Sequence, residues 1–212
     1  MPNPPGKISQ QLVLPGFGDP PPPEWRRALP GFPRHALFLA FRLSQANTEQ
    51  FLEETTPVRR RFGLFNPPIP PERLHMTVFP IGAGDEPPPP TLVERVSQAM
   101  DSLATTPLAI PLDRIQSFRN RRSQWPLVAA ARQRHAAMIA LQSGIRNALR
   151  ARGLDPPRYE GSSPHVTSTW DRDIPEPIDI PPITLRADRI LLIHSHVGKA
   201  RHDALESWRL GR

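Results

Sequence analysis

The sequence predicts a mixed fold of helices and strands that is built as two similar halves. Strand-length apolar runs alternate with segments whose apolar residues recur at helical spacing, and this alternation is found twice along the chain. Each half also contains one strand-like run with a histidine two residues before a threonine, in RLHMTVFP at 73–80 and in SPHVTSTW at 163–170. The repeated order and the repeated motif indicate an internal duplication with pseudo-twofold symmetry.

The chain has 212 residues, which is enough for one sizeable core and predicts one compact unit. Residues 1–33 are predicted to be a proline-rich tail, since proline lacks the backbone N–H that helices and central strands use. Residues 34–212 are predicted to form the folded domain.

In the first half, a buried strand is expected at the start of the domain, followed by a helix with Ser44 as a possible N-cap. Pro57 is expected to break or end that helix, because its ring clashes with the preceding turn. Strands and helices then alternate. The predicted ranges are a strand at 35–43, a helix at 44–62, a strand at 72–82, a helix at 91–104 and a strand at 108–118.

The second half repeats the rhythm. Its helix has the clearest periodicity in the chain, with Gly153 as its stop signal, and one or two strands are expected to close the sheet. The predicted ranges are a strand at 125–133, a helix at 135–153, a strand at 163–171 and a closing stretch at 183–197.

The composition limits the chemistry. The chain has no cysteine, which excludes disulfides, thiolate metal sites and cysteine nucleophiles. No run approaches the roughly 18 apolar residues of a membrane span, and no signal peptide is evident at the N-terminus, so a soluble, cytoplasmic protein is expected.

The net charge of +7 is compatible with an RNA partner, and basic residues are concentrated at 59–61 and 118–125. Only Lys7 and Lys199 are lysines, however, and a GC-rich coding bias that favours arginine and proline is an equally good explanation of the charge.

The two His-x-Thr motifs carry the functional signal. Alternate residues of a strand point to the same face, so His75 is expected to share a face with Thr77, and His165 to share one with Thr167 and Thr169. A threonine hydroxyl can donate to a phosphate oxygen, while a histidine gives or takes a proton near neutral pH. Each motif is therefore a plausible half of a phosphate site.

Two such halves facing each other would supply an acid and a base. Opening a cyclic phosphodiester requires water to be deprotonated on one side of phosphorus and the leaving oxygen to be protonated on the other. This reaction needs no metal. Taken singly, each histidine is better explained as an ordinary hydrogen-bonded residue of an edge strand.

With these motifs the chain resembles the two-histidine phosphoesterases. The stretches that carry the resemblance are ALFLAF, ERLHMTVFPIG, GSSPHVTSTW and ILLIHSHVGKARHDALESWRL, which follow one another in the family's order between residues 35 and 212. Within that superfamily, the chain is most similar to the bacterial RNA 2′,3′-cyclic phosphodiesterases, or 2′-5′ RNA ligase-like proteins.

The resemblance implies a bilobal α+β fold in which two antiparallel sheets face a central cleft. It also implies metal-independent hydrolysis, without a cofactor, of RNA 2′,3′-cyclic phosphate ends to 2′-phosphomonoesters. His75 would be the acid that protonates the leaving 3′ oxygen, and His165 the base that activates water. Thr77 and Thr167 would bind the phosphate.

Members of the family often carry a basic residue just past the second motif. In this sequence Trp170 and Asp171 come first, and the basic residue Arg172 follows them. Arg172 is a candidate substrate contact, and Trp170 could stack on a base. Trp125 is a third candidate, as an aromatic residue next to a basic segment, although a loop residue packed on the edge of the core is a slightly better explanation of it.

The remaining histidines are weaker candidates for a site. His194 and His196 share a strand face and could bind a metal together with His202, but only Asp203 adds a carboxylate nearby, so no metal site is predicted. His35 and His135 begin predicted elements and are expected to be surface or capping residues.

Two other activities need the same histidines: 2′-5′ RNA ligation and hydrolysis of small cyclic nucleotides. A third possibility belongs to another class, a non-catalytic RNA-binding protein that uses the basic surface. It is disfavoured because both histidines and both threonines are present. A monomer is expected, since no spare amphipathic helix requires a partner.

Overall fold

The computed structural model describes residues 33–118, 125–157 and 163–211. The predicted tail at 1–33 lies almost wholly outside the described residues, as does most of the basic segment at 118–125. The division into tail and domain therefore stays a prediction.

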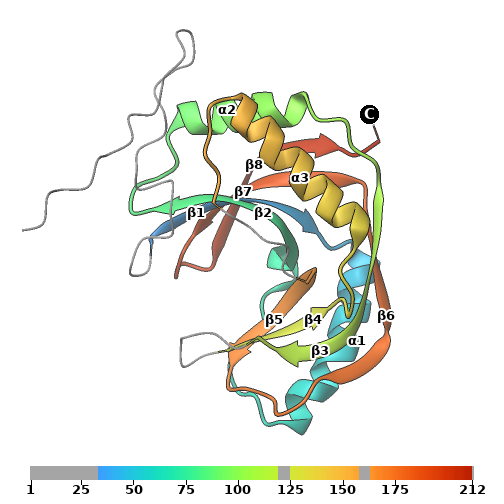
Figure 1. Ribbon diagram of the computed structural model, residues 1–212. Helices are drawn as coiled ribbons and strands as arrows, with labels where there is room; N and C mark the ends of the chain where they lie inside the picture. Colours follow the sequence, from blue (N-terminus) through green and yellow to red (C-terminus); the bar gives the residue numbers. More distant parts are fainter. Residues whose placement is uncertain (1–32, 119–124, 158–162, 212) are drawn as a thin grey trace, which may run out of the picture.

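In the described part of the chain, eight strands form two four-stranded antiparallel sheets, shown one above the other in Figure 1. The first sheet has the order β2-β1-β7-β8 and the second the order β5-β4-β3-β6. The strands of the first sheet are β1 His35–Arg42, β2 His75–Gly84, β7 Arg189–His196 and β8 Arg201–Arg209. Those of the second are β3 Leu108–Ser117, β4 Trp125–Ala130, β5 His165–Asp171 and β6 Ile178–Ala187. The bilobal α+β fold is confirmed.

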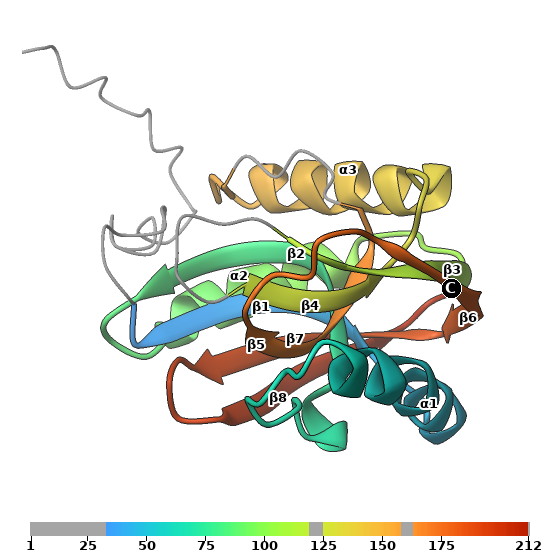
Figure 2. The ribbon, with the colours of Figure 1, turned by 90° about the horizontal axis from the view of Figure 1, so that it is seen from below.

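The described residues also form three α-helices: α1 Gln45–Arg61, α2 Pro90–Asp101 and α3 Ala136–Ala151. A short 3-10 turn at Pro71–Arg73 precedes β2. Helices α2 and α3 contact each other and pack against the first sheet, whereas α1 packs against β6 of the second (Figure 1). In Figure 2, α1 and α3 lie on opposite sides of the molecule. No helix in the described ranges has the length and apolar character needed to span a bilayer.

The duplicated unit is a strand, a helix and a second strand that starts with the motif histidine. The two copies are β1-α1-β2 and β4-α3-β5. The second strand of each copy is an edge strand of its sheet, and the two edge strands β2 and β5 are in contact. The fold therefore brings the two motifs together from the edges of two different sheets.

The strand β1 shows how the motif strands are anchored. Its core-facing residues Leu37, Leu39 and Phe41 are fully or almost fully buried, while Phe38 faces the other side. Phe41 lies three positions after Phe38, and residues an odd number of positions apart in a strand point to opposite faces, so only one of the two can face the cleft. Burial of the apolar face fixes the register of the whole sheet, because a slip of one residue would expose it.

Two predicted helix ends are confirmed. The Ser44 hydroxyl caps α1 by accepting the backbone N–H of Asn47. Gly153 follows α3 with a φ of +69°, a conformation that glycine adopts without steric cost.

The prediction that Pro57 ends its helix is wrong, since α1 continues through it to Arg61. The proline removes the hydrogen bond to the carbonyl of Glu53, but both residues are exposed and solvent can satisfy that carbonyl. On the opposite side of the helix, Phe51, Thr55 and Val58 are buried. Their packing spans the proline and holds the helix together.

Candidate active site

A cleft of about 650 Å³ lies between the two sheets, and both motifs contribute to its walls. Its lining comes from β1, β2, β5, β7 and β8 and from the connections before β2 and after β7. The described residues that line it are Phe38, Ile69, Arg73, His75, Thr77, His165, Thr167, Trp170, Ser195, His196, Val197, Gly198 and His202.

The first motif shows the alternation predicted from the sequence. His75 and Thr77 line the cleft, whereas Met76 and Val78 are completely buried on the other face of β2. The apolar residues thus anchor the strand in the core, and this anchoring aims the two polar side chains into the cleft.

The second motif follows the same alternation only for its first half. His165 and Thr167 line the cleft and Val166 is buried, but Thr169 is also fully buried, so the prediction that it shares the face of His165 and Thr167 is wrong. The register of β5 against β4 shifts between the pairs Leu127 with Thr169 and Val128 with Thr167. This bulge inverts the alternation.

As a consequence of the bulge, Trp170 lines the cleft beside the motif, with 41% of its surface exposed. Thr169 instead donates a hydrogen bond to the carbonyl of Pro67 at 3.0 Å, and Ile69 N–H donates to Ser168 O at 2.7 Å. The connection before β2 is thereby fastened to β5, which ties the two motif strands together.

Each motif histidine is held by the same local hydrogen bond. Nδ1 of His75 lies 2.7 Å from the carbonyl oxygen of Arg73, and Nδ1 of His165 lies 2.9 Å from that of Ser163. A carbonyl can only accept, so Nδ1 carries the proton in both rings. The lone pair of Nε2 is therefore free for a substrate in either histidine.

Aromatic rings support both imidazoles. Phe38 stacks on His75 with ring centroids 5.1 Å apart, and Phe118 meets His165 edge-on at 4.8 Å. His202 contacts the edge of His75 at 5.2 Å. These contacts restrict ring rotation, so the Nε2 atoms are positioned before any substrate binds.

Burial is the main influence on the protonation of the cleft histidines. Desolvation lowers the pKa of both His75 and His165, and the hydrogen bonds to the Arg73 and Ser163 carbonyls oppose this only in part. The pKa of His202 falls to about 4, through burial first and then through the positive charge of His75 and of nearby arginines. With these lowered pKa values, the three histidines are mainly neutral near pH 7.

This shift predicts a pH-dependent stability. An unfolded histidine has a pKa near 6.5, so between about pH 6.5 and 4 the unfolded chain binds a proton at His202 that the folded chain does not. The stability contributed by neutral His202 is therefore complete above pH 6.5 and is lost as the pH falls toward 4. His202→Gln should flatten the fall of Tm across this window, as measured by calorimetry.

His135→Gln is the matched control for that experiment, because His135 is not among the described cleft residues. The Tm of His202→Gln should still fall in part as the pH is lowered, since His75 and His165 titrate in the same direction. If the Tm of His202→Gln fell with pH as steeply as that of the wild type, His202 would not be a source of the pH-dependent stability.

Arg172 and Trp125 are placed elsewhere. The Arg172 guanidinium donates to the carbonyls of Phe62 at 2.6 Å and Gly63 at 2.9 Å, and so binds the end of α1. Glycine suits position 63 for two reasons: its φ is +56°, and a Cβ there would come within 2.9 Å of the Arg172 guanidinium. Trp125 is partly buried at the start of β4, opposite Asp171. Neither side chain is among the described residues that line the cleft.

Arg73 and His202 are among the cleft residues that were not singled out as site residues from the sequence. Arg73 precedes the first motif, and its buried Nε has no hydrogen-bond partner among the described residues. Strand alternation could not have found it, because Arg73 ends the 3-10 turn that precedes β2. The sequence pattern suggested His202 only as a metal ligand with His194, whereas the structure places it against His75.

This fold and site define a class of protein, in which two lobes each present one His-x-Thr strand to a shared cleft. That is the architecture of a two-histidine phosphoesterase. Residues 48–199 match the model of the 2′-5′ RNA ligase superfamily, and the chain belongs to that superfamily. The family's chemistry is RNA-related phosphoester chemistry of the phosphoesterase or ligase type.

Solved structures show the same fold. The chain is similar to apo LigT of E. coli, with 21% identity, a TM-score of 0.62 and coverage of 86% of this chain and 100% of LigT. It is also similar to TT0787 of Thermus thermophilus, with 22% identity, a TM-score of 0.62 and coverage of 82% and 97%. A structure of E. coli LigT complexed with 3′-AMP matches with 19% identity, a TM-score of 0.60 and coverage of 86% and 100%. No curated protein matches the sequence.

Proposed function

We propose that the protein hydrolyses RNA 2′,3′-cyclic phosphate ends to 2′-phosphomonoesters, with His75 and His165 as the acid–base pair. The observation that carries this proposal is the matched pair of histidines in one cleft, each with Nδ1–H bonded to a carbonyl and Nε2 free. Two equivalent proton-transfer groups from opposite lobes are what an in-line displacement at phosphorus requires.

In the proposed reaction, Nε2 of His165 takes a proton from water as the water oxygen forms a bond to phosphorus. The bond from phosphorus to the 3′ oxygen breaks, and His75 delivers a proton to that oxygen from Nε2. The product is a 2′-phosphomonoester with a free 3′-hydroxyl, so the two proton transfers balance. Thr77 and Thr167 donate hydrogen bonds to the non-bridging oxygens, where negative charge develops.

The substrate itself can set the required protonation states. Burial favours the neutral form of both histidines, and one of them must be protonated to act as the acid. A phosphodiester anion bound next to His75 raises the pKa of that imidazole, since an opposite charge favours the protonated form. His165 then stays neutral as the base. Trp170, on the cleft wall, offers a face on which the adjoining base can stack.

Arg73 is proposed to bind the substrate phosphate or the neighbouring phosphodiester, because it lines the cleft and its buried Nε has no hydrogen-bond partner among the described residues. Arg73→Gln should lower kcat/KM for a cyclic-phosphate oligonucleotide by roughly 10- to 100-fold, the value of one charge-assisted hydrogen bond. Steady-state kinetics at low and moderate salt would measure the loss. Arg172→Gln is the matched control, since that arginine binds the end of α1; equal losses in the two variants would contradict the role of Arg73.

The activity is tested by offering chelator-treated protein three substrates in parallel. These are an oligoribonucleotide with a 2′,3′-cyclic phosphate end, the same oligonucleotide with a 5′-hydroxyl partner strand, and a mononucleotide 2′,3′-cyclic phosphate. The proposal expects rapid hydrolysis of the first. Joining of the two strands would indicate a ligase, exclusive turnover of the mononucleotide would indicate a small cyclic-nucleotide phosphodiesterase, and binding without turnover would indicate an RNA-binding protein.

A further inference from the structure

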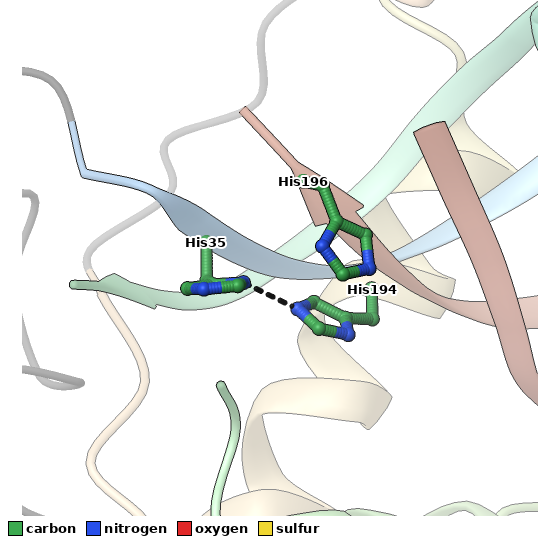
Figure 3. A group of neighbouring side chains, drawn as sticks. All are labelled: His35, His194 and His196. Atoms are coloured by element: carbon green, nitrogen blue, oxygen red, sulfur yellow. Dashed lines mark hydrogen bonds between the residues drawn. The ribbon is translucent and has the colours of Figure 1, made fainter. Parts of the chain in front are cut away.

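Three histidines that the proposed reaction does not use converge at one end of the first sheet (Figure 3). They are His35, the first residue of β1, and His194 and His196, at the end of β7. The register pairs His35 directly with His196, and His194 with Leu37, so all three side chains belong to one face. One nitrogen from each ring lies within 4.8 Å of the others.

The backbone fixes this arrangement. Val197 N–H donates to the carbonyl of Arg34 at 2.9 Å, which extends the pairing of β1 and β7 beyond the histidines. His194 is only 7% exposed, while His35 and His196 are partly buried. The rings are packed on one another, with centroids 4.3 Å apart for His194 and His196 and 5.0 Å apart for His35 and His194.

The hydrogen bonds of the three rings fix which nitrogens carry protons. Nδ1 of His35 lies 2.8 Å from Nε2 of His194, so one of these nitrogens donates to the other. Nε2 of His196 lies 2.9 Å from Oδ2 of Asp203, a carboxylate that Arg201 also holds at 2.8 and 2.9 Å. With its Nε2 proton engaged by Asp203, His196 keeps the lone pair of Nδ1 free.

We propose that His35, His194 and His196 together bind one divalent transition-metal ion, for which zinc is the best match. Imidazole nitrogens are preferred zinc ligands, and a tetrahedral ion with Zn–N bonds of about 2.0–2.1 Å separates its ligand atoms by about 3.3 Å. The present nitrogens are 2.8 Å apart at the closest pair, and all lie within 4.8 Å, so small side-chain rotations would reach that geometry. Asp203 is the carboxylate that orients His196, the usual outer partner of a metal-bound histidine.

The position of the site suggests what the ion does. The ion would connect His35, the first residue of β1, to the end of β7, which leads into the turn at residues 197–200. Val197 and Gly198 of that turn line the cleft, and His196 borders it. The ion would therefore clamp β1 to the wall of the cleft. This role is structural and is separate from the proton transfers of His75 and His165.

The test is a zinc titration of untagged full-length protein that has first been stripped with a chelator and then freed of it. One zinc ion should bind per chain, and Tm should rise by about 5–10 °C when zinc exceeds its Kd a hundredfold. Cobalt substituted for zinc should give the intense visible absorption of a tetrahedral site. Failure to bind stoichiometrically, or binding without any rise of Tm, would overturn the proposal.

Matched variants separate this site from the cleft, whose own histidines could also attract zinc. His35→Ala and His196→Ala should each abolish the cobalt spectrum and the rise of Tm. Asp203→Asn should weaken binding by roughly 10- to 100-fold. His135→Ala and the His75→Ala, His165→Ala double variant should bind as the wild type does. Binding that persists in His35→Ala and His196→Ala but is lost in the double variant would place the ion in the cleft and refute the proposed site.

Discussion

His75→Ala and His165→Ala are each expected to lower kcat for cyclic phosphate hydrolysis by roughly a hundredfold or more, because each removes a general acid or base. Both rings line the cleft and both have Nε2 free, so the losses should be of similar size. The double variant should lose little more than the single ones, since the two proton transfers belong to one step. Single-turnover rates on a cyclic-phosphate oligoribonucleotide would measure these effects.

Two controls make the result specific. His135→Ala removes a histidine that is not among the described cleft residues and should retain full activity. Circular dichroism and Tm would show that the variants fold. A loss of less than tenfold in either motif variant would contradict acid–base catalysis by that histidine and would return it to a supporting role.

The second large effect is expected from the threonines. Thr77→Val and Thr167→Val keep the shape of the side chain and remove the hydroxyl that is proposed to bind the phosphate. Each should lower kcat/KM by roughly 10- to 100-fold, which corresponds to the loss of one hydrogen bond to a charged group. Steady-state kinetics would measure the loss for each variant.

Thr169→Val provides the matched control for the threonine pair. Its hydroxyl bonds the carbonyl of Pro67 and is buried away from the cleft. This substitution should lower Tm and leave kcat/KM nearly unchanged at temperatures where the protein is folded. Equal kinetic losses in Thr167→Val and Thr169→Val would show that the threonines act on the structure of β5 and not on the phosphate.

The paired motifs could be predicted from the sequence because strand alternation is a local property. His75, Thr77, His165 and Thr167 lie in apolar runs whose burial fixes which face they occupy, and the structure places all four on the cleft. The bulge that buries Thr169 has no comparable local signal. It depends on how β5 pairs with β4, and the same bulge brings Trp170 into the cleft.

Other features depend on contacts between distant parts of the chain. The strand at Arg201–Arg209 was not predicted, since most of its residues are exposed and its pattern lacks an apolar face. His35 was expected at the surface, but it packs against His194, which is 159 residues away in sequence. Arg172 was a reasonable substrate contact by its charge alone, yet the carbonyls at the end of α1 hold it.

The position of the product phosphate tests the central claim most directly. Chelator-treated wild-type protein would be incubated in ¹⁸O-labelled water with an oligoribonucleotide that ends in a 2′,3′-cyclic phosphate. If His165 activates water and His75 protonates the 3′ oxygen, the product is a 2′-phosphomonoester with one ¹⁸O on phosphorus. A 3′-phosphate product, or intact RNA that remains bound, would contradict this account of the cleft.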